Sequence, residues 1–299
     1  MPTLYIAGVA LTLTGEGVDA ALGADAAPFL SPAPLPDGAD PHLISRSVEI
    51  RVVDQWPVPR PDQLSADQPS EDLKFSETPA DAQGSKAPSD AQICYWREDV
   101  RLDWQPGGLR GVAWMNGERA EIWAVVQLAL SAALLQHGGG LIHASAGVID
   151  GAGWLCPGPS GTGKSTIARE AGFDAVLADE IVAVRPGEGG YTLWGTPFWS
   201  QGRALPLQNG GAPLAVLARP IQATAVSLGP LPEDEAAAWL LRCVTLYDDA
   251  PASRAAAFGL ACDLVGRVDP IWLRFPKEGP WLPAALKAYR QTSSSRPTI

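Results

Sequence analysis

The segment GPSGTGKST, at residues 158–166, has the residue types and spacing best suited to chemistry. It fits G-x-x-x-x-G-K-[ST] at every fixed position, which is the Walker A pattern of phosphate-binding loops (P-loops). The glycines let the backbone curl so that successive N–H groups point at phosphate oxygens. In such loops the lysine reaches the β- and γ-phosphates and the serine hydroxyl holds Mg²⁺. The motif predicts a nucleotide site made by Gly158, Pro159, Ser160, Gly161, Thr162, Gly163, Lys164, Ser165 and Thr166.

The residues around this motif favour the same interpretation. An apolar strand is expected before it, at 153–156, and helix-compatible residues follow it. The alternative is a glycine-rich turn that matches the pattern by chance. A strand on one side and a helix on the other argue against chance, because phosphate-binding loops join these two elements.

A second candidate is the acidic pair Asp179-Glu180, which begins 15 residues after Lys164. The pair ends an apolar stretch, and we expect this strand to lie beside the P-loop strand, with its carboxylates at the carboxyl edge of the sheet. Phosphoryl transfer uses a carboxylate on the metal and a base for the attacking hydroxyl. We predict Asp179 for the metal, with Ser165, and Glu180 for the base, on opposite sides of the strand. The alternative is a solvated acidic turn, which the apolar flanks disfavour.

The third candidate is His143, within the apolar run 141–149. Its strand is expected next to the P-loop strand. His143 then either is a core residue with satisfied hydrogen bonds, or faces the phosphates or hydrogen-bonds the Asp179 carboxylate. We therefore predict His143, Lys164, Asp179 and Glu180 as the catalytic set.

The order of these features resembles a known family. A strand histidine, a P-loop written GPSGTGKS, a very short helix and an acidic pair in LADE are similar to the catalytic domain of HPr kinase/phosphorylase and its relatives. That domain has the phosphoenolpyruvate carboxykinase-like nucleotide-binding fold. The resemblance covers roughly residues 141–202 well. It implies that Asp179 joins the metal and histidine network, and that the second acid is the base. That acid is Glu180 here, where HPr kinases proper have aspartate, and this departure weakens the inference of the same acceptor.

The segment 193–203 falls where this family has another active-site segment, but it lacks the HPr-specific signature. It contains Gly195, Pro197 and the aromatic residues Phe198 and Trp199. These residues either shape a substrate pocket or pack in the ordinary way, and ordinary packing is slightly favoured.

The resemblance implies an ATP-dependent phosphotransferase that uses Mg²⁺ and acts on a hydroxyl, with a serine of a protein or peptide as the expected acceptor. Two alternatives stay open: a small-metabolite kinase, and a nucleotide-binding regulatory protein with little turnover. The acceptor, and the choice of ATP, ADP or pyrophosphate as donor, are also open.

The expected elements give an α/β (α+β) fold with a β-rich N-terminal part. The resemblance implies a phosphoenolpyruvate carboxykinase-like P-loop core with a mixed sheet and flanking helices. We expect the N-terminal part at 1–117, with a mobile proline-rich acidic segment at 55–92, the kinase-like domain at 118–291 and a tail at 292–299. Strands are expected at 4–13, 47–56, 93–96, 99–104, 109–115, 141–149, 153–158, 175–184, 191–196, 213–220 and 271–275. Helices are expected at 118–136, after the P-loop, and at 233–242, 253–265 and 281–291.

Composition limits the partners of the chain. Its 299 residues are 46% hydrophobic, enough for a sizeable core, and its net charge of −11 disfavours nucleic acid and anionic membranes. The longest apolar run, 122–135, is shorter than the roughly 20 residues that a membrane span needs. Four cysteines without a C-x-x-C pair, and no basic N-terminal region, favour the cytoplasm. The sequence allows a homo-oligomer.

Overall fold

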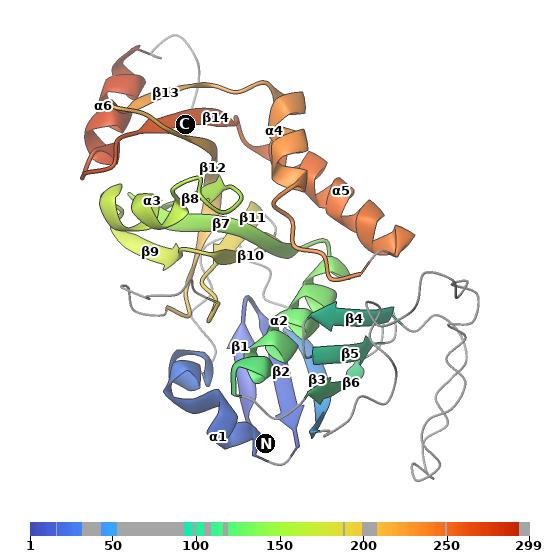
Figure 1. Ribbon diagram of the computed structural model, residues 1–299. Coiled ribbons are helices and arrows are strands. Elements are labelled where there is room, and N and C mark those ends of the chain that lie inside the picture. The colour runs from blue at the N-terminus through green and yellow to red at the C-terminus, as the bar shows by residue number, and fades with distance from the viewer. Residues whose placement is uncertain are drawn as a thin grey trace, which may run out of the picture.

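The described residues form two β-sheets, each of which mixes parallel and antiparallel strands (Figure 1). This computed structural model confirms the expected mixed α/β class. The structure describes residues 1–15, 17–31, 43–52, 93–97, 100–104, 109–115, 119–187, 189–198, 208–248 and 250–292. The segment 55–92 and the tail after 292 lie outside these ranges.

The first sheet is built from the N-terminal part of the chain. Its strand order is β1-β2-β3-β6-β5-β4. The strands are β1 (Thr3–Ile6), β2 (Val9–Thr14), β3 (Ile44–Val52), β4 (Ile93–Arg97), β5 (Val100–Trp104) and β6 (Arg110–Met115). Helix α1 (Val18–Leu22) and the 3₁₀ helix η1 (Gly23–Phe29) follow β2. The strands expected at 93–96, 99–104 and 109–115 are confirmed, and the one expected at 47–56 begins earlier, at Ile44.

The single strand expected at 4–13 is wrong, because the chain turns back in its middle. Ile6 of β1 lies opposite Val9 of β2, so that Ala7 and Gly8 form a two-residue hairpin loop. Both loop residues have positive φ, 52° and 71°, which is the backbone of the tight hairpin turn that glycine favours. Ala7 carries no strong turn signal, so the apolar run alone predicts one continuous strand.

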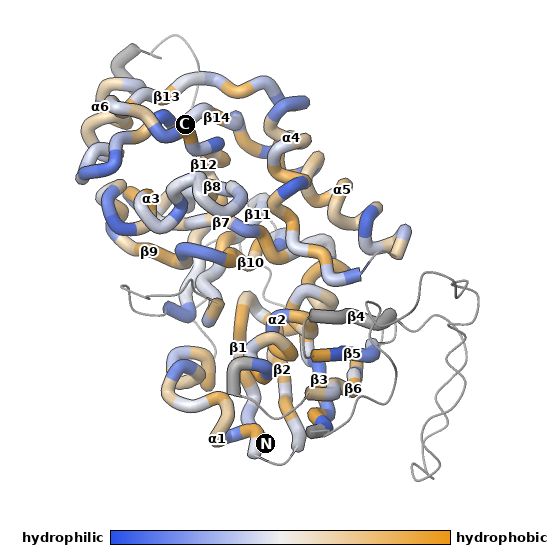
Figure 2. Tube along the Cα trace, in the orientation of Figure 1, coloured by the Kyte–Doolittle hydropathy of each residue, from blue (hydrophilic) through white to orange (hydrophobic). Residues whose placement is uncertain are grey.

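Helix α2 (Arg119–Leu135) lies between the two sheets and confirms the helix expected at 118–136. Its apolar residues share one core with β1, β2, β3, β5 and β6, and this core also includes Leu141 and Ala183 of the second sheet. Figure 2 shows hydrophobic positions along α2 and the strands next to it. The helix is therefore apolar on most sides because it packs on most sides.

The second sheet follows the order β11-β10-β7-β8-β12-β14-β13, with β9 also paired to β7. Its strands are β7 (Gly140–Ile149), β8 (Ala152–Pro157), β9 (Ala175–Ala178), β10 (Ile181–Gly187), β11 (Gly190–Trp194), β12 (Gly211–Gln222), β13 (Ser227–Pro230) and β14 (Ile271–Phe275). Because β11 also pairs with β12, the strands β7, β8, β12, β11 and β10 close into a ring. Strand β8 lies between the antiparallel β7 and the parallel β12.

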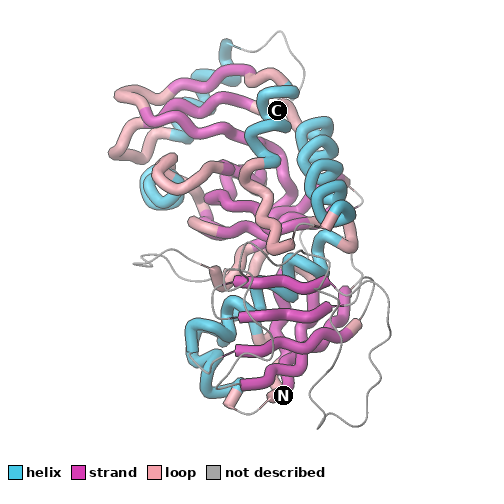
Figure 3. The backbone as a smooth tube through the Cα atoms, turned by 45° about the vertical axis from the view of Figure 1, so that its right-hand side comes forward, coloured by secondary structure: helices cyan, strands magenta, loops and turns pink. Residues whose placement is uncertain are grey.

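Helices cover both faces of this sheet. Helices α4 (Glu233–Leu241) and α5 (Pro251–Arg267) share one core with Ala144, Ala146 and Leu155. Helices α3 (Lys164–Glu170) and α6 (Leu282–Thr292) share another with Cys156 and Phe275. Figure 3 shows α4 and α5 together along one side of the sheet. In the part of the chain that is described, no helix is both long and apolar enough to cross a membrane.

We predict that Gly147 of β7 tolerates no side chain. A Cβ atom at this position would overlap the Phe173 ring. Gly147→Ala should therefore lower the free energy of unfolding by about 1–3 kcal/mol, the usual cost of overpacking. The control is Gly259→Ala, on an exposed turn of α5 with nothing near the new methyl group. That change should stabilise the protein by about 0.5–1 kcal/mol. Chemical denaturation measures both, and equal effects would contradict the predicted overlap.

Candidate functional site

The P-loop motif occupies the turn between β8 and α3. Strand β8 ends at Pro157 and α3 begins at Lys164, so the predicted strand and helix are both present. Gly161 and Gly163 have φ values of 84° and 94°, in the left-handed region that glycine adopts without strain. A Cβ atom on Gly163 would also lie 2.7 Å from the Phe275 ring, so this glycine is needed for space as well.

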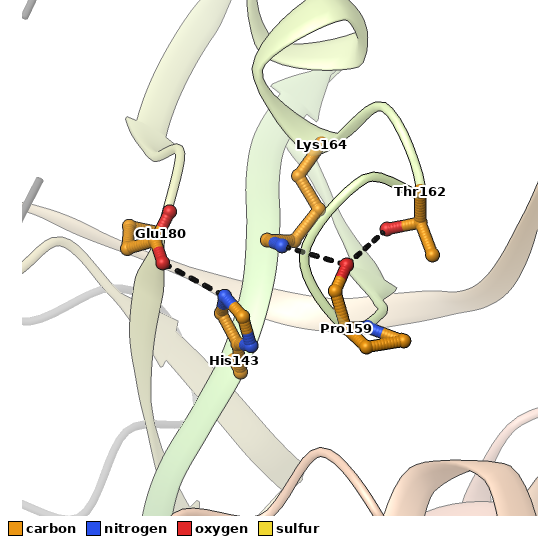
Figure 4. Close-up of polar contacts among 5 residues, drawn as sticks. All are labelled: His143, Pro159, Thr162, Lys164 and Glu180. Carbon is orange, nitrogen blue, oxygen red and sulfur yellow. Dashed lines mark hydrogen bonds and ion pairs between the residues drawn. The ribbon is translucent and has the colours of Figure 1, made fainter. Parts of the chain in front are cut away.

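Hydrogen bonds close the loop onto itself (Figure 4), and a further one ties it to β12. Inside the loop, the Pro159 carbonyl accepts from the Thr162 hydroxyl at 2.8 Å and from the Lys164 ammonium at 3.1 Å. At its far end, the Gln222 side-chain amide donates to the Gly161 carbonyl at 2.8 Å. These three hydrogen bonds hold the loop in its curved shape.

The Lys164 side chain runs from the start of α3 into the space between the Pro159 carbonyl and the side chains of His143 and Glu180 (Figure 4). The residue is only 5% exposed. Burial lowers the pKa of its ammonium group, and the negative charges of Glu180 and Asp179 oppose that shift. The structure thus places Lys164 near the acidic pair, with which it was predicted to form one catalytic set.

The acidic pair lies beside β7, not beside the P-loop strand as predicted. Both sides of β8 are taken, by β7 and by β12, so the returning chain pairs with the free side of β7 instead. The single strand expected at 175–184 is also wrong, because it divides into β9 and β10 with Asp179-Glu180 between them. Both strands pair with β7, one after the other along its length: Ala178 lies opposite Ala146, and Ile181 lies opposite His143.

His143 hydrogen-bonds Glu180, not Asp179 as one of the predicted alternatives had it. Its Nε2 atom lies 2.8 Å from Glu180 Oε1, and the two side chains are 27% and 33% exposed. In an unbroken strand, Ile181 would share the His143 side of the sheet and Glu180 would point away. The break at 179–180 turns the Glu180 carboxylate to the same side as the histidine. The predicted adjacency of the His143 strand and the P-loop strand is confirmed.

The contact with His143 favours the charged form of Glu180. The hydrogen bond from His143 lowers the pKa of this carboxyl group, burial opposes the shift, and the nearby charges of His143 and Lys164 lower the pKa further. Glu180 is therefore a carboxylate at neutral pH, which is the form that accepts a proton.

Asp179 and Ser165 carry the ligand chemistry that Mg²⁺ prefers. Asp179 is 6% exposed and close enough to affect the pKa of Lys164, and Ser165 lies in the first turn of α3. No group of three or more His, Cys, Asp or Glu side chains suited to a metal occurs among the described residues. In proteins Mg²⁺ binds through one or two carboxylates together with the phosphates of its substrate, and a serine hydroxyl completes its ligands in P-loop proteins. The donor set therefore fits this ion.

Of the two aromatic residues predicted in the segment 193–203, one is described and packs in the ordinary way. Phe198 is buried in the core shared with α2, and Trp199 lies outside the described residues. Sequence reasoning missed Thr196, whose hydroxyl donates to the Ile181 carbonyl at 2.6 Å, directly after the acidic pair. This hydrogen bond holds the chain in place just after the acidic pair. A lone threonine after a strand gives no signal in the sequence that it makes such a bond.

No protein-family model matches the chain, and a search of curated proteins also finds no match.

We predict that His143→Phe raises the pKa of the Glu180 carboxyl, because the hydrogen bond that lowers it is lost. The lowered pKa stabilises the fold above the ordinary glutamate value of about 4.3, and this contribution is lost as the pH falls through the folded-state pKa. Carboxyl-carbon NMR titration measures the shift. His137→Phe, at the end of α2, is the control and should leave this pKa unchanged. An unaltered Glu180 titration in His143→Phe would contradict the assignment.

Proposed function

We propose that this protein is an ATP-dependent phosphotransferase that acts on a hydroxyl group, similar to the HPr kinase/phosphorylase family. The observation that carries the proposal is the meeting of three groups: a closed P-loop, the buried Lys164 ammonium and the Glu180 carboxylate hydrogen-bonded to His143. A cation for the phosphates and a base beside it are the two protein groups that phosphoryl transfer needs.

The sheet also supports a phosphoenolpyruvate carboxykinase-like core. In doubly wound nucleotide-binding folds the sheet is mostly parallel. Here the P-loop strand β8 has an antiparallel neighbour, β7, and a parallel one, β12. Asp179, the carboxylate that we propose for the metal, also follows the P-loop after only one short helix, α3, and one strand, β9.

In the proposed reaction the loop amides and Lys164 bind the β- and γ-phosphates of ATP. The acceptor oxygen attacks the γ-phosphorus, its proton passes to the Glu180 carboxylate, and the bond from the γ-phosphorus to the β–γ bridging oxygen breaks, releasing ADP. His143 holds the Glu180 carboxylate in place through its Nε2 atom. Ser165 and Asp179 would hold Mg²⁺, which supplies charge neutralisation to the phosphates.

The acceptor class that we propose is a serine of a protein or peptide. Incubation of the protein with γ-labelled ATP and host lysate tests it directly. Label on a protein or peptide supports the proposal. Label on a small molecule identifies a metabolite kinase, and nucleotide binding without label identifies a regulatory protein with little turnover.

We predict that Lys164→Ala weakens the binding of Mg²⁺-ATP roughly 10- to 100-fold, because hydrogen bonds to charged groups contribute about 1.5–3 kcal/mol. Calorimetric titration of the wild type and the variant measures the difference. Lys287→Ala removes the same charge from an exposed position on α6 and should bind ATP as the wild type does. Equal affinities for wild type and Lys164→Ala would refute a phosphate-binding role for this lysine.

We predict that substitutions of Glu180 and Asp179 affect different steps. Glu180→Gln keeps the shape of the side chain but removes the base, so we expect transfer to fall roughly 10²- to 10⁴-fold with little change in nucleotide affinity. Asp179→Asn should weaken Mg²⁺-dependent nucleotide binding as well as the rate. Steady-state kinetics with the labelled acceptor, over a range of Mg²⁺ concentrations, separates the two. Glu233→Gln, at the exposed start of α4, is the matched control. Full activity in Glu180→Gln would show that Glu180 is not the base, and His143 would be the next candidate.

A further inference from the structure

One peptide group, between Pro157 and Gly158, is held from both sides at the entrance to the P-loop. Its N–H, on Gly158, donates to the His143 carbonyl of β7 at 3.0 Å. Its carbonyl, on Pro157, accepts from the indole Nε1–H of Trp239, on α4, at 3.0 Å. The orientation of this peptide group sets the direction in which the chain enters the loop.

Trp239 bonds β8 beyond the end of its pairing with β12. This strand runs parallel to β8 until Leu217 lies opposite Leu155, and from Ala218 it pairs with β14. The two strands therefore separate before β8 reaches Pro157. The indole N–H of Trp239 lies where the strands have parted, and supplies a donor to the last carbonyl of β8.

The Trp239 ring is itself held in place. The Arg219 guanidinium lies 4.4 Å from the centre of the Trp239 ring and 4.4 Å from the centre of the Trp272 ring. Arg219 also lies 3.6 Å from the Glu235 carboxylate, one turn before Trp239 on α4. A guanidinium over an aromatic face is attracted by the ring quadrupole, so this stack limits the movement of the indole.

The same end of α4 reaches the proposed catalytic pair. The Cys243 carbonyl accepts from the His143 N–H at 2.7 Å, so α4 and its C-terminal turn bond both the P-loop entrance and the strand that carries His143. A shift of α4 would move the phosphate site and the His143 backbone together.

We infer that Trp239 is a positioning residue for the P-loop: its indole N–H orients the Pro157–Gly158 peptide group, and Arg219 and Trp272 hold the indole in place. This inference rests on the proposed function, because the loop that it orients is taken to bind nucleotide phosphates. No substrate contact is assigned to Trp239, which acts through the loop backbone.

The test is Trp239→Phe, which keeps an aromatic ring for Arg219 and removes the donor to Pro157. In the ligand-free protein, the amide of Gly158 should exchange its hydrogen about 3- to 10-fold faster than in the wild type, the range expected for one lost hydrogen bond. The KM for ATP should rise by a similar factor while kcat changes less than about twofold. The matched control is Trp272→Phe, whose ring stacks on the same arginine with no hydrogen bond to the loop.

The outcomes separate positioning from general stability. Hydrogen exchange of the Gly158 amide and the KM for ATP should both rise in Trp239→Phe and stay unchanged in Trp272→Phe. The melting temperatures of the two variants should be similar. If both variants match the wild type in exchange and KM, or if both change in parallel with their melting temperatures, the inference is wrong. A second variant, Arg219→Gln, frees the ring without removing the donor, and should shift both readouts in the same direction by less. A wild type that binds no ATP would refute the proposed function, and exchange at Gly158 would still decide the role of Trp239.

Discussion

Three hydrogen bonds of His143 join the parts of the candidate site. Its backbone N–H bonds the Cys243 carbonyl after α4, its carbonyl bonds the Gly158 N–H at the P-loop entrance, and its side chain bonds Glu180. They depend on the pairing of β7 with β8 on one side and with β9 and β10 on the other, and on its bridge to the segment after α4. A shift of one residue in that register would turn the His143 side chain to the opposite face of the sheet. The site therefore depends on the register of one strand.

Charge balance is the second constraint on this site. Lys164 is buried at the start of α3, and burial of an unpaired ammonium group is costly. The Pro159 carbonyl accepts its hydrogen bond, and the carboxylates of Glu180 and Asp179 lie near enough to favour its charged form. The buried ammonium group is therefore balanced by carboxylates from the turn between β9 and β10.

Local spacing was enough to predict several parts of this protein. The P-loop motif requires glycines with positive φ, and Gly161 and Gly163 have them. The helix at 118–136 and the strand at 141–149 follow from long apolar patterns, which tertiary packing preserves. The acidic pair and His143 were singled out because polar residues inside apolar runs are uncommon there. Each of these features lies within one short segment, so the sequence alone was sufficient to recognise it.

Which segments meet was decided by the tertiary structure. The acidic pair joined β7 and not β8, because β12, from much later in the chain, already occupies the second side of β8. The break between β9 and β10 paired His143 with Glu180 and not with Asp179. Trp239 lies 82 residues after the carbonyl that it bonds, and its role depends on where β12 leaves β8. The sequence by itself determined which residues can do chemistry, because motif spacing is local. The tertiary structure decided their partners, because strand pairing is a competition among segments far apart in the chain.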